Sequence, residues 1–127
     1  MEQFYINREK DLEEEKQFDI SEVAKESGLL FTIYVTEYIW KGIIEPDEEA
    51  TKRGEDEKTR TKEVLSELVS AIRLARQQGK TNIISFKASL TKEGKSQDFE
   101  IMSYLGPIGK ENNNPCITLF TGQDIQN

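Results

Sequence analysis

Histidine is absent from the 127-residue chain, and cysteine occurs only once. Without histidine, Ser-His-Asp and Cys-His catalysis, histidine acid/base chemistry and zinc sites of the usual composition are excluded. Because Cys116 has no intramolecular partner, no disulfide can staple the fold, and a reducing, cytoplasmic location is expected. Long apolar runs are also missing: no segment approaches the roughly 18 residues of a membrane span, and the start of the chain lacks the basic and apolar stretches of a secretory signal. These absences predict a soluble, cytoplasmic protein.

Glycine-rich phosphate loops are missing as well. The sequence contains neither the full P-loop pattern, which needs a further glycine five residues before Gly-Lys-Ser or Gly-Lys-Thr, nor the glycine triplet of a dinucleotide site. The candidate general acids Glu37 and Glu100 have no identifiable partner. We therefore predict no enzymatic role, no catalytic residues, no metal site and no cofactor.

Charge is plentiful, but it is unevenly distributed. Charged residues make up 32% of the chain and hydrophobic residues 35%, which suffices for a single domain over residues 1–127. Residues 1–57 hold 17 of the 24 acidic and 7 of the 17 basic side chains, a net charge of −10, whereas residues 58–127 have a net charge of +3. Such a chain repels nucleic acid and anionic lipid, so basic proteins are the favoured charged partners.

Apolar periodicity predicts the order of the secondary structure. A short helix should open at Asp19–Glu22 and end at Gly28, a second should run from Thr36 to Glu45 before Pro46, and a long amphipathic helix should span 59–78. Alternating patterns predict strands over 82–91, 96–105 and 116–121, and residues 29–35 suit a further strand. Loops are expected at 46–58, with a candidate helical turn at 47–52, and at 106–115.

These elements predict an α+β domain of two layers. Short connections favour a three-stranded antiparallel meander in the order 82–91, 96–105, 116–121, with 29–35 as a candidate fourth strand at its edge and two to four helices on one face. The acidic N-terminal segment, residues 1–17, is expected as a frayed helix or a solvated loop, and residues 122–127 as a frayed tail.

Six carboxylates are concentrated in the segment that follows Pro46, and three interpretations apply to them. These residues are Asp47, Glu48, Glu49, Glu55, Asp56 and Glu57. They could bind magnesium or calcium, although they lack the alternating ligand spacing of a calcium hand. They could engage a basic partner, or they could only keep a loop solvated. We include Tyr38 and Trp40 in the same candidate partner-binding set, because aromatic residues serve either as core or as interface anchors.

A second charged group is basic and lies in the other half of the chain. It comprises Arg73, Arg76, Lys80, Lys87, Lys92 and Lys95. These residues could form a nucleic-acid surface, but they lack interleaved aromatics. Complementing a helix C-terminus and protecting an edge strand are structural roles that would also explain them.

Part of the chain resembles a family of small bacterial and phage proteins that is known only as a domain of unknown function. The resemblance rests on the segment from Phe18 to Gly28, FDISEVAKESG, on the segment VTEYIW that starts at Val35, and on the acidic loop, long helix and C-terminal strands that follow. It spans about Phe18 to Gly122 and implies accessory cargo of plasmids, integrative elements and phages. The acid run near the N-terminus departs from the family pattern, and no catalytic residues come with the resemblance.

Three functional hypotheses follow. The first is a non-catalytic, partner-binding accessory protein of a mobile element, in its concrete form an anti-defence (anti-CRISPR-like) inhibitor whose acidic surface occupies the basic nucleic-acid-binding surface of a host or element-encoded protein. The alternatives are a nucleic-acid-associated accessory factor and a structural domain without enzymatic role. A homodimer, formed through a sheet edge or the Tyr38/Trp40 helix, is compatible with the pattern.

Overall fold

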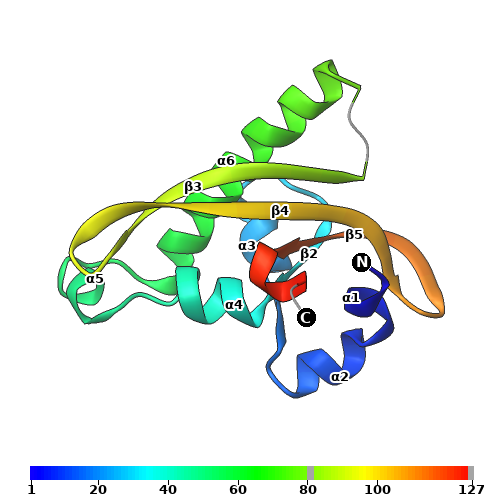
Figure 1. Cartoon of the computed structure of the whole chain (residues 1–127), viewed down its shortest axis with the longest axis horizontal. Coiled ribbons are helices and arrows are strands. Elements are labelled where there is room, and N and C mark those ends of the chain that lie inside the picture. The colour runs from blue at the N-terminus through cyan, green and yellow to red at the C-terminus, as the bar shows by residue number, and fades with distance from the viewer. Residues whose placement is uncertain (80–81, 126–127) are drawn as a thin grey trace.

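A computed structural model describes residues 1–79 and 82–125, which form one mixed sheet with helices packed against it (Figure 1). The strands are β1 (Gln17–Asp19), β2 (Thr32–Thr36), β3 (Ile83–Lys92), β4 (Lys95–Gly109) and β5 (Asn112–Phe120). The α-helices are α1 (Glu2–Ile6), α2 (Arg8–Glu13), α3 (Ser21–Glu26), α4 (Glu37–Ile39), α5 (Glu48–Lys52) and α6 (Glu57–Gln77). A π-helix, η1 (Trp40–Ile44), continues α4, and a 3-10 helix, η2 (Gly122–Ile125), follows β5. None of the helices in the described ranges combines the length and the apolar character needed to cross a bilayer.

The sheet has the strand order β1-β2-β5-β4-β3. Strands β3, β4 and β5 form the predicted antiparallel meander, so the α+β class is confirmed. The prediction of a purely antiparallel sheet of three or four strands is wrong, because the sheet has five strands and β2 pairs in parallel with β5. Strand β2 does lie beside the β5 edge of the meander, as predicted for residues 29–35, and β1 pairs with its other side. Both errors have one cause: β1 has only three residues, and parallel pairing between distant segments leaves no local pattern.

The segment predicted as a loop at 106–115 is mostly strand. Strand β4 continues to Gly109 and β5 begins at Asn112. Pro107 lies opposite Pro115, and the register shifts between Pro107 and Gly109. Proline has no amide hydrogen to donate to a ladder, so it is tolerated at such irregularities. The glycine, proline and asparagine residues therefore mark an irregular hairpin end.

The main hydrophobic core lies on the face of the sheet that packs against α3 and α6. Alternate strand residues supply one side of it: Ile33, Val35, Phe86, Ala88, Leu90, Ile101, Ile117 and Leu119. Helical residues supply the other: Ala24, Ile39, Ile43, Ile44, Val64, Leu65 and Leu68. The alternate apolar residues of the strands thus pack against the apolar stripe of α6, as the sequence predicts.

The opposite face of the sheet is covered by the N-terminal segment, so the architecture differs from the expected two layers. The rings of Phe4 in α1 and Phe120 in β5 have centroids 5.0 Å apart. The guanidinium of Arg8, at the start of α2, lies 4.1 Å from the centroid of the Tyr34 ring in β2. Because side chains alternate along a strand, Tyr34 and Phe120 point away from the main core. Residues 1–13, expected to be frayed or solvated, therefore supply a small third layer.

Arg8 joins this N-terminal layer to the sheet through polar contacts. It is 3% exposed, and its guanidinium donates to the carbonyl oxygen of Ile108 at 2.9 Å, to Gln17 Oε1 and to Cys116 Sγ at 3.4 Å. The buried amide of Gln17 extends the network, because its Nε2 donates to Asp11 Oδ2 at 2.9 Å. Burial lowers the pKa of Arg8 from its usual value, against the effect of the neighbouring thiol.

The C-terminal segment is also attached to the sheet. Asp124 Oδ2 accepts hydrogen bonds from Thr36 Oγ1 at 2.8 Å and from the Thr121 amide at 2.7 Å. These contacts order η2, where a frayed tail was expected. The last part of that expected tail, residues 126–127, lies outside the described residues.

We expect Arg8→Ala to lower the free energy of unfolding by about 3 kcal/mol, because it leaves the buried Gln17 Oε1 and Ile108 carbonyl without their donor. Urea denaturation followed by circular dichroism measures this change. The matched control is Arg53→Ala, at an exposed position, which should stay within about 0.5 kcal/mol of the unsubstituted chain. Equal effects of the two substitutions would contradict a structural role for Arg8.

Candidate partner-binding surface

The six predicted carboxylates lie at one end of the molecule, where α5 and the start of α6 meet the β3–β4 turn (Figure 1). We call this set the acidic corner: Asp47, Glu48, Glu49, Glu55, Asp56 and Glu57. The helical turn predicted over 47–52 is confirmed as α5, and α6 starts at Glu57, slightly earlier than expected. Among residues 1–79 and 82–125, no three Asp, Glu or Cys side chains are grouped so that they could hold a metal ion.

Asp47 and Asp56 are the N-caps of the two helices. Asp47 Oδ1 accepts from the Ala50 amide at 2.9 Å, and its Oδ2 accepts from the amide of Glu93 in the β3–β4 turn at 2.8 Å. Asp56 Oδ1 accepts from the Thr59 amide at 2.7 Å. These backbone hydrogen bonds lower the pKa of both carboxyl groups. Both acids therefore have a structural role that ordinary helix capping explains.

Glu55 is the partner of a buried arginine. Arg60 is 2% exposed, and its Nη1 donates to Glu55 Oε1 at 2.9 Å. The second carboxylate oxygen, Oε2, accepts from Thr91 Oγ1 of β3 at 2.8 Å. The remaining guanidinium donors bond to the carbonyl oxygens of Ile43, at 2.7 Å, and Ile44, at 2.9 Å. One side chain thus connects α6, the loop before it, β3 and η1.

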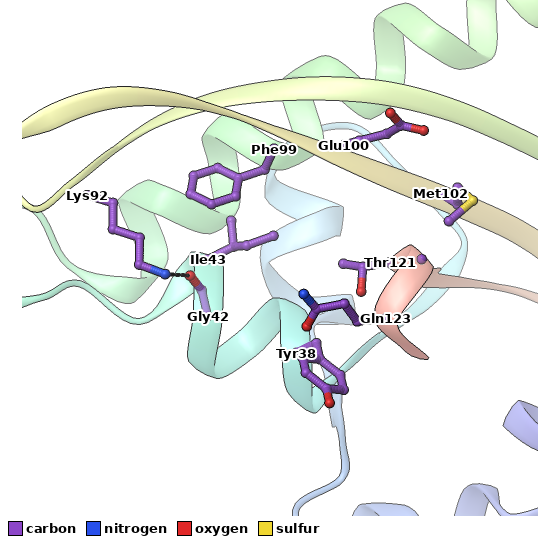
Figure 2. A pocket seen from close by; sticks show the side chains of 10 residues that line it. Tyr38, Gly42, Ile43, Lys92, Phe99, Glu100, Met102, Thr121 and Gln123 are labelled. Carbon is purple, nitrogen blue, oxygen red and sulfur yellow. Dashed lines mark hydrogen bonds between the residues drawn. The ribbon is translucent and has the colours of Figure 1, made fainter. Parts of the chain in front are cut away.

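The π-helix explains why the side chains of Arg60 and Lys92 both lie at the end of η1. The Glu45 amide donates to Trp40 O at 2.8 Å, five residues back, so the last carbonyl groups of the helix lack the usual helical donors. Arg60 donates to two of these carbonyl groups, those of Ile43 and Ile44. Lys92 Nζ donates to another, Gly42 O, at 3.2 Å (Figure 2). The positive charges also complement the negative end of the helix dipole.

The other three acids of the corner, Glu48, Glu49 and Glu57, are exposed. None of them forms an ion pair with another described residue. They lie in the first turns of α5 and α6, whose positions are fixed by the caps and by Arg60. The corner therefore presents three exposed carboxylates that lack an ion-pair partner among the described residues, on two helix starts that are held by hydrogen bonds.

Tyr38 lies in a groove that leads toward the acidic corner. The groove has a volume of about 510 Å³ and runs from Tyr38 past Gly42 to Lys92, with α4 and η1 on one side and β4 and η2 on the other (Figure 2). Tyr38 is 53% exposed, so its ring is available to a partner. Phe99 and Ile43 contribute apolar surface farther along the groove.

Trp40 does not share this groove. Its ring stacks on Phe18 of β1, with centroids 5.0 Å apart and an interplanar angle of 17°. It is partly buried against the main core and lines a separate cavity with Ile20 and Thr61. Of the two predicted aromatic anchors, the structure exposes Tyr38, while Trp40 is a packing residue.

The predicted basic surface is divided between distant places. Arg73 and Arg76 are exposed near the end of α6, whereas Lys92 is bound to Gly42 at the far end of the ten-residue strand β3. A strand of that length extends about 30 Å. Lys87 and Lys95 are exposed, and Lys80 lies outside the described residues. The described part of the group does not form one continuous cationic patch.

Sequence reasoning missed the two buried arginines on which this geometry depends. A signal for Arg60 existed, because it precedes Val64 by four residues and so lies on the buried stripe of α6. The signal for Arg8 was weaker: Phe4 precedes it by four residues, but the charged residues 9–11 follow it at once. A cation on an apolar face indicates a buried polar partner.

No protein-family model, curated protein or solved structure matches the chain. The resemblance to a family of phage and plasmid proteins therefore stays a prediction.

Glu55→Gln should lower the free energy of unfolding by about 1–2 kcal/mol, since the buried Arg60 loses its charged hydrogen-bond partner. Glu48→Gln removes the same charge from an exposed position and should change stability by less than about 0.5 kcal/mol. Urea denaturation of the two variants side by side tests the distinction. If they are equally stable, Glu55 does not support the corner.

The caps also predict a dependence of stability on pH. The folded-state pKa values of Asp47 and Asp56 are lowered, so their contribution is present above the unfolded value of about 3.9 and is lost as the pH falls through the folded values. In the double variant D47N/D56N each cap keeps one acceptor oxygen but loses the charge, and position 47 also loses its second acceptor, which adds a cost that does not depend on pH. The stability difference between unsubstituted chain and variant should be largest near neutral pH and should shrink on acidification below about pH 4. Denaturation midpoints across this range measure it, and a difference that does not vary with pH would contradict the assignment.

Proposed function

We propose that the protein is a non-catalytic binding protein whose acidic corner docks on a basic surface of another protein. The observation that carries the proposal is the presence of three exposed carboxylates, without an ion-pair partner among the described residues, on two helix starts that Asp47 and Arg60 hold in place. Preorganised charges bind with little loss of conformational entropy on docking. Tyr38, in the adjoining groove, supplies an exposed aromatic contact of the kind that anchors interfaces.

The partner that best fits this chemistry is a nucleic-acid-binding protein of the host or of a mobile element. Carboxylates held in a fixed array form ion pairs with arginine and lysine side chains that otherwise contact phosphate groups. An anti-defence inhibitor is the concrete form of this proposal. The alternative of direct nucleic-acid binding has less support, because the described basic residues are separated and the net charge is −7.

The test uses a variant that leaves the structural acids intact. In E48K/E49K/E57K the capping residues Asp47 and Asp56 and the Arg60 partner Glu55 are unchanged. Immobilised full-length protein and this variant are used to capture proteins from a bacterial lysate, and each captured protein is then purified and titrated. We expect the affinity of a true partner to fall at least about threefold, since three exposed ion pairs contribute about 0.2–1 kcal/mol each. Affinity should also fall with rising salt, and double-stranded DNA should compete with binding.

The control variant E9K/E67K/E111K changes the net charge equally at exposed positions outside the corner. It should keep the affinity of the unsubstituted chain, and both variants should melt close to it. Equal losses for both variants would show that only net charge matters. Captured proteins that are all acidic, or that DNA does not displace, would overturn the proposal.

A further inference from the structure

A second groove lies toward the other end of α6. It has a volume of about 600 Å³ and is lined by the second half of α6, by the loop between α3 and β2, and by the hairpin end of β4 and β5. In Figure 1 this end of α6 projects beyond the sheet. The described lining includes Arg73 and Arg76 but no Asp or Glu.

Leu30 makes one wall of this groove apolar. It is 90% exposed, although its neighbours Leu29 and Phe31 are partly buried and pack against the main core. The local backbone explains this arrangement: Gly28, with φ of +85°, ends α3, and the chain then turns toward β2. Leu29 and Phe31 close the core, so the fold does not use the Leu30 side chain. An exposed leucine within a concave apolar surface is typical of a binding site.

The α6 wall combines an apolar stripe with two cations. Val69, Ile72, Arg73 and Arg76 follow the spacing i, i+3, i+4, i+7 and so lie on one face of the helix. Val69 and Ile72 are only partly buried, whereas Leu68 is fully buried in the core. The apolar stripe of α6 therefore divides: its first part fills the core, and its second part lines the groove.

The two arginines are available to a ligand. Both are exposed, and neither forms an ion pair with any residue in the described ranges. A guanidinium group matches a carboxylate with two parallel hydrogen bonds, and its planar fork is preorganised for that contact. Their position beside Leu30, Val69 and Ile72 places anion recognition next to apolar surface.

We propose that this groove binds a short peptide segment of a partner protein in which an apolar side chain is flanked by acidic residues. The apolar side chain would lie against Leu30, Val69 and Ile72, and the carboxylates would pair with Arg73 and Arg76. Charge complementarity selects an acidic segment over a basic one. The lining is mainly aliphatic, and its one described aromatic residue, Phe31, is partly buried and packs against the main core. This favours a peptide over a nucleic acid, whose bases stack on exposed aromatic platforms. This site is independent of the acidic corner and would recognise a partner of opposite charge.

The probe is a library of random short peptides displayed on phage and selected on immobilised full-length protein. Enriched peptides are synthesised with a fluorescent label and titrated by anisotropy against the unsubstituted chain, R73E/R76E, L30S and the control R53E. We expect enriched sequences to pair acidic with apolar residues. R73E/R76E should weaken binding at least tenfold, and L30S at least about threefold, while R53E and the corner variant E48K/E49K/E57K should bind normally.

Several results would overturn this proposal. One is the absence of any enriched peptide, and another is enrichment of basic sequences. A third is binding that R73E/R76E and R53E weaken equally, which would show a general charge effect. Mobility shift of single-stranded DNA by the unsubstituted chain, abolished in R73E/R76E, would assign the arginines to nucleic acid instead. Thermal melting of R73E/R76E and L30S should match that of the unsubstituted chain, because the positions are exposed, and it separates lost binding from lost folding.

Discussion

The guanidinium of Arg60 is the contact on which the arrangement of the acidic end depends. It donates to two carbonyl groups at the end of η1 and to Glu55, whose other oxygen holds Thr91 of β3. A π-helix leaves terminal carbonyls that need donors, and a buried arginine needs acceptors, so each feature satisfies the other. Arg60 thus fixes the start of α6 relative to η1 and β3, and the Asp47 cap holds α5 against the β3–β4 turn. A lysine, with a single ammonium centre, could not reach the same set of acceptors.

The sheet has a second buried arginine on its opposite face, and its chemistry differs. Arg60 contacts a carboxylate directly, whereas Arg8 contacts a carbonyl, an amide oxygen, a thiol and an aromatic face. Asp11 is connected to Arg8 by hydrogen bonds through the amide of Gln17. With 35% hydrophobic residues, most of them used in the core against α6, the chain has few aliphatic residues left for this second face. Instead of aliphatic packing, polar contacts and the aromatic pair Phe4–Phe120 attach the third layer to the sheet.

Those parts of the fold that follow from local periodicity could be predicted from the sequence. The stripe of α6 and the alternation in β3 locate their core residues, since Leu65 and Leu68, and Phe86 and Ala88, are buried as their spacing requires. The parallel pairing of β2 with β5 could not be predicted, because it joins residues such as Ile33 and Ile117 that no short-range signal relates. The N-terminal layer could not be predicted for another reason. Its buried residues include Arg8 and Gln17, which a hydrophobicity pattern assigns to solvent.

The six carboxylates of the candidate site lie in one segment, but their separate roles could not be predicted from the sequence. A run of carboxylates looks uniform, whereas the structure uses Asp47 and Asp56 as caps and Glu55 as an arginine partner. Only backbone geometry reveals which amides those oxygens face. What distinguishes Glu48, Glu49 and Glu57 is that none of their carboxylates forms a side-chain hydrogen bond or an ion pair with another described residue.

The same distinction separates two binding ends along one helix. Acids at the start of α6 and arginines near its end both complement the helix dipole, so their signs alone indicate nothing about function. Glu57, Arg73 and Arg76, however, remain exposed without an ion pair in the described chain, and Leu30 is exposed beside the arginines. The 21 residues of α6 extend about 30 Å, which is nearly four Debye lengths at physiological salt. Each end therefore acts on a partner through its own local charge, and the net charge of −7 does not prevent an acidic segment from binding at the arginines.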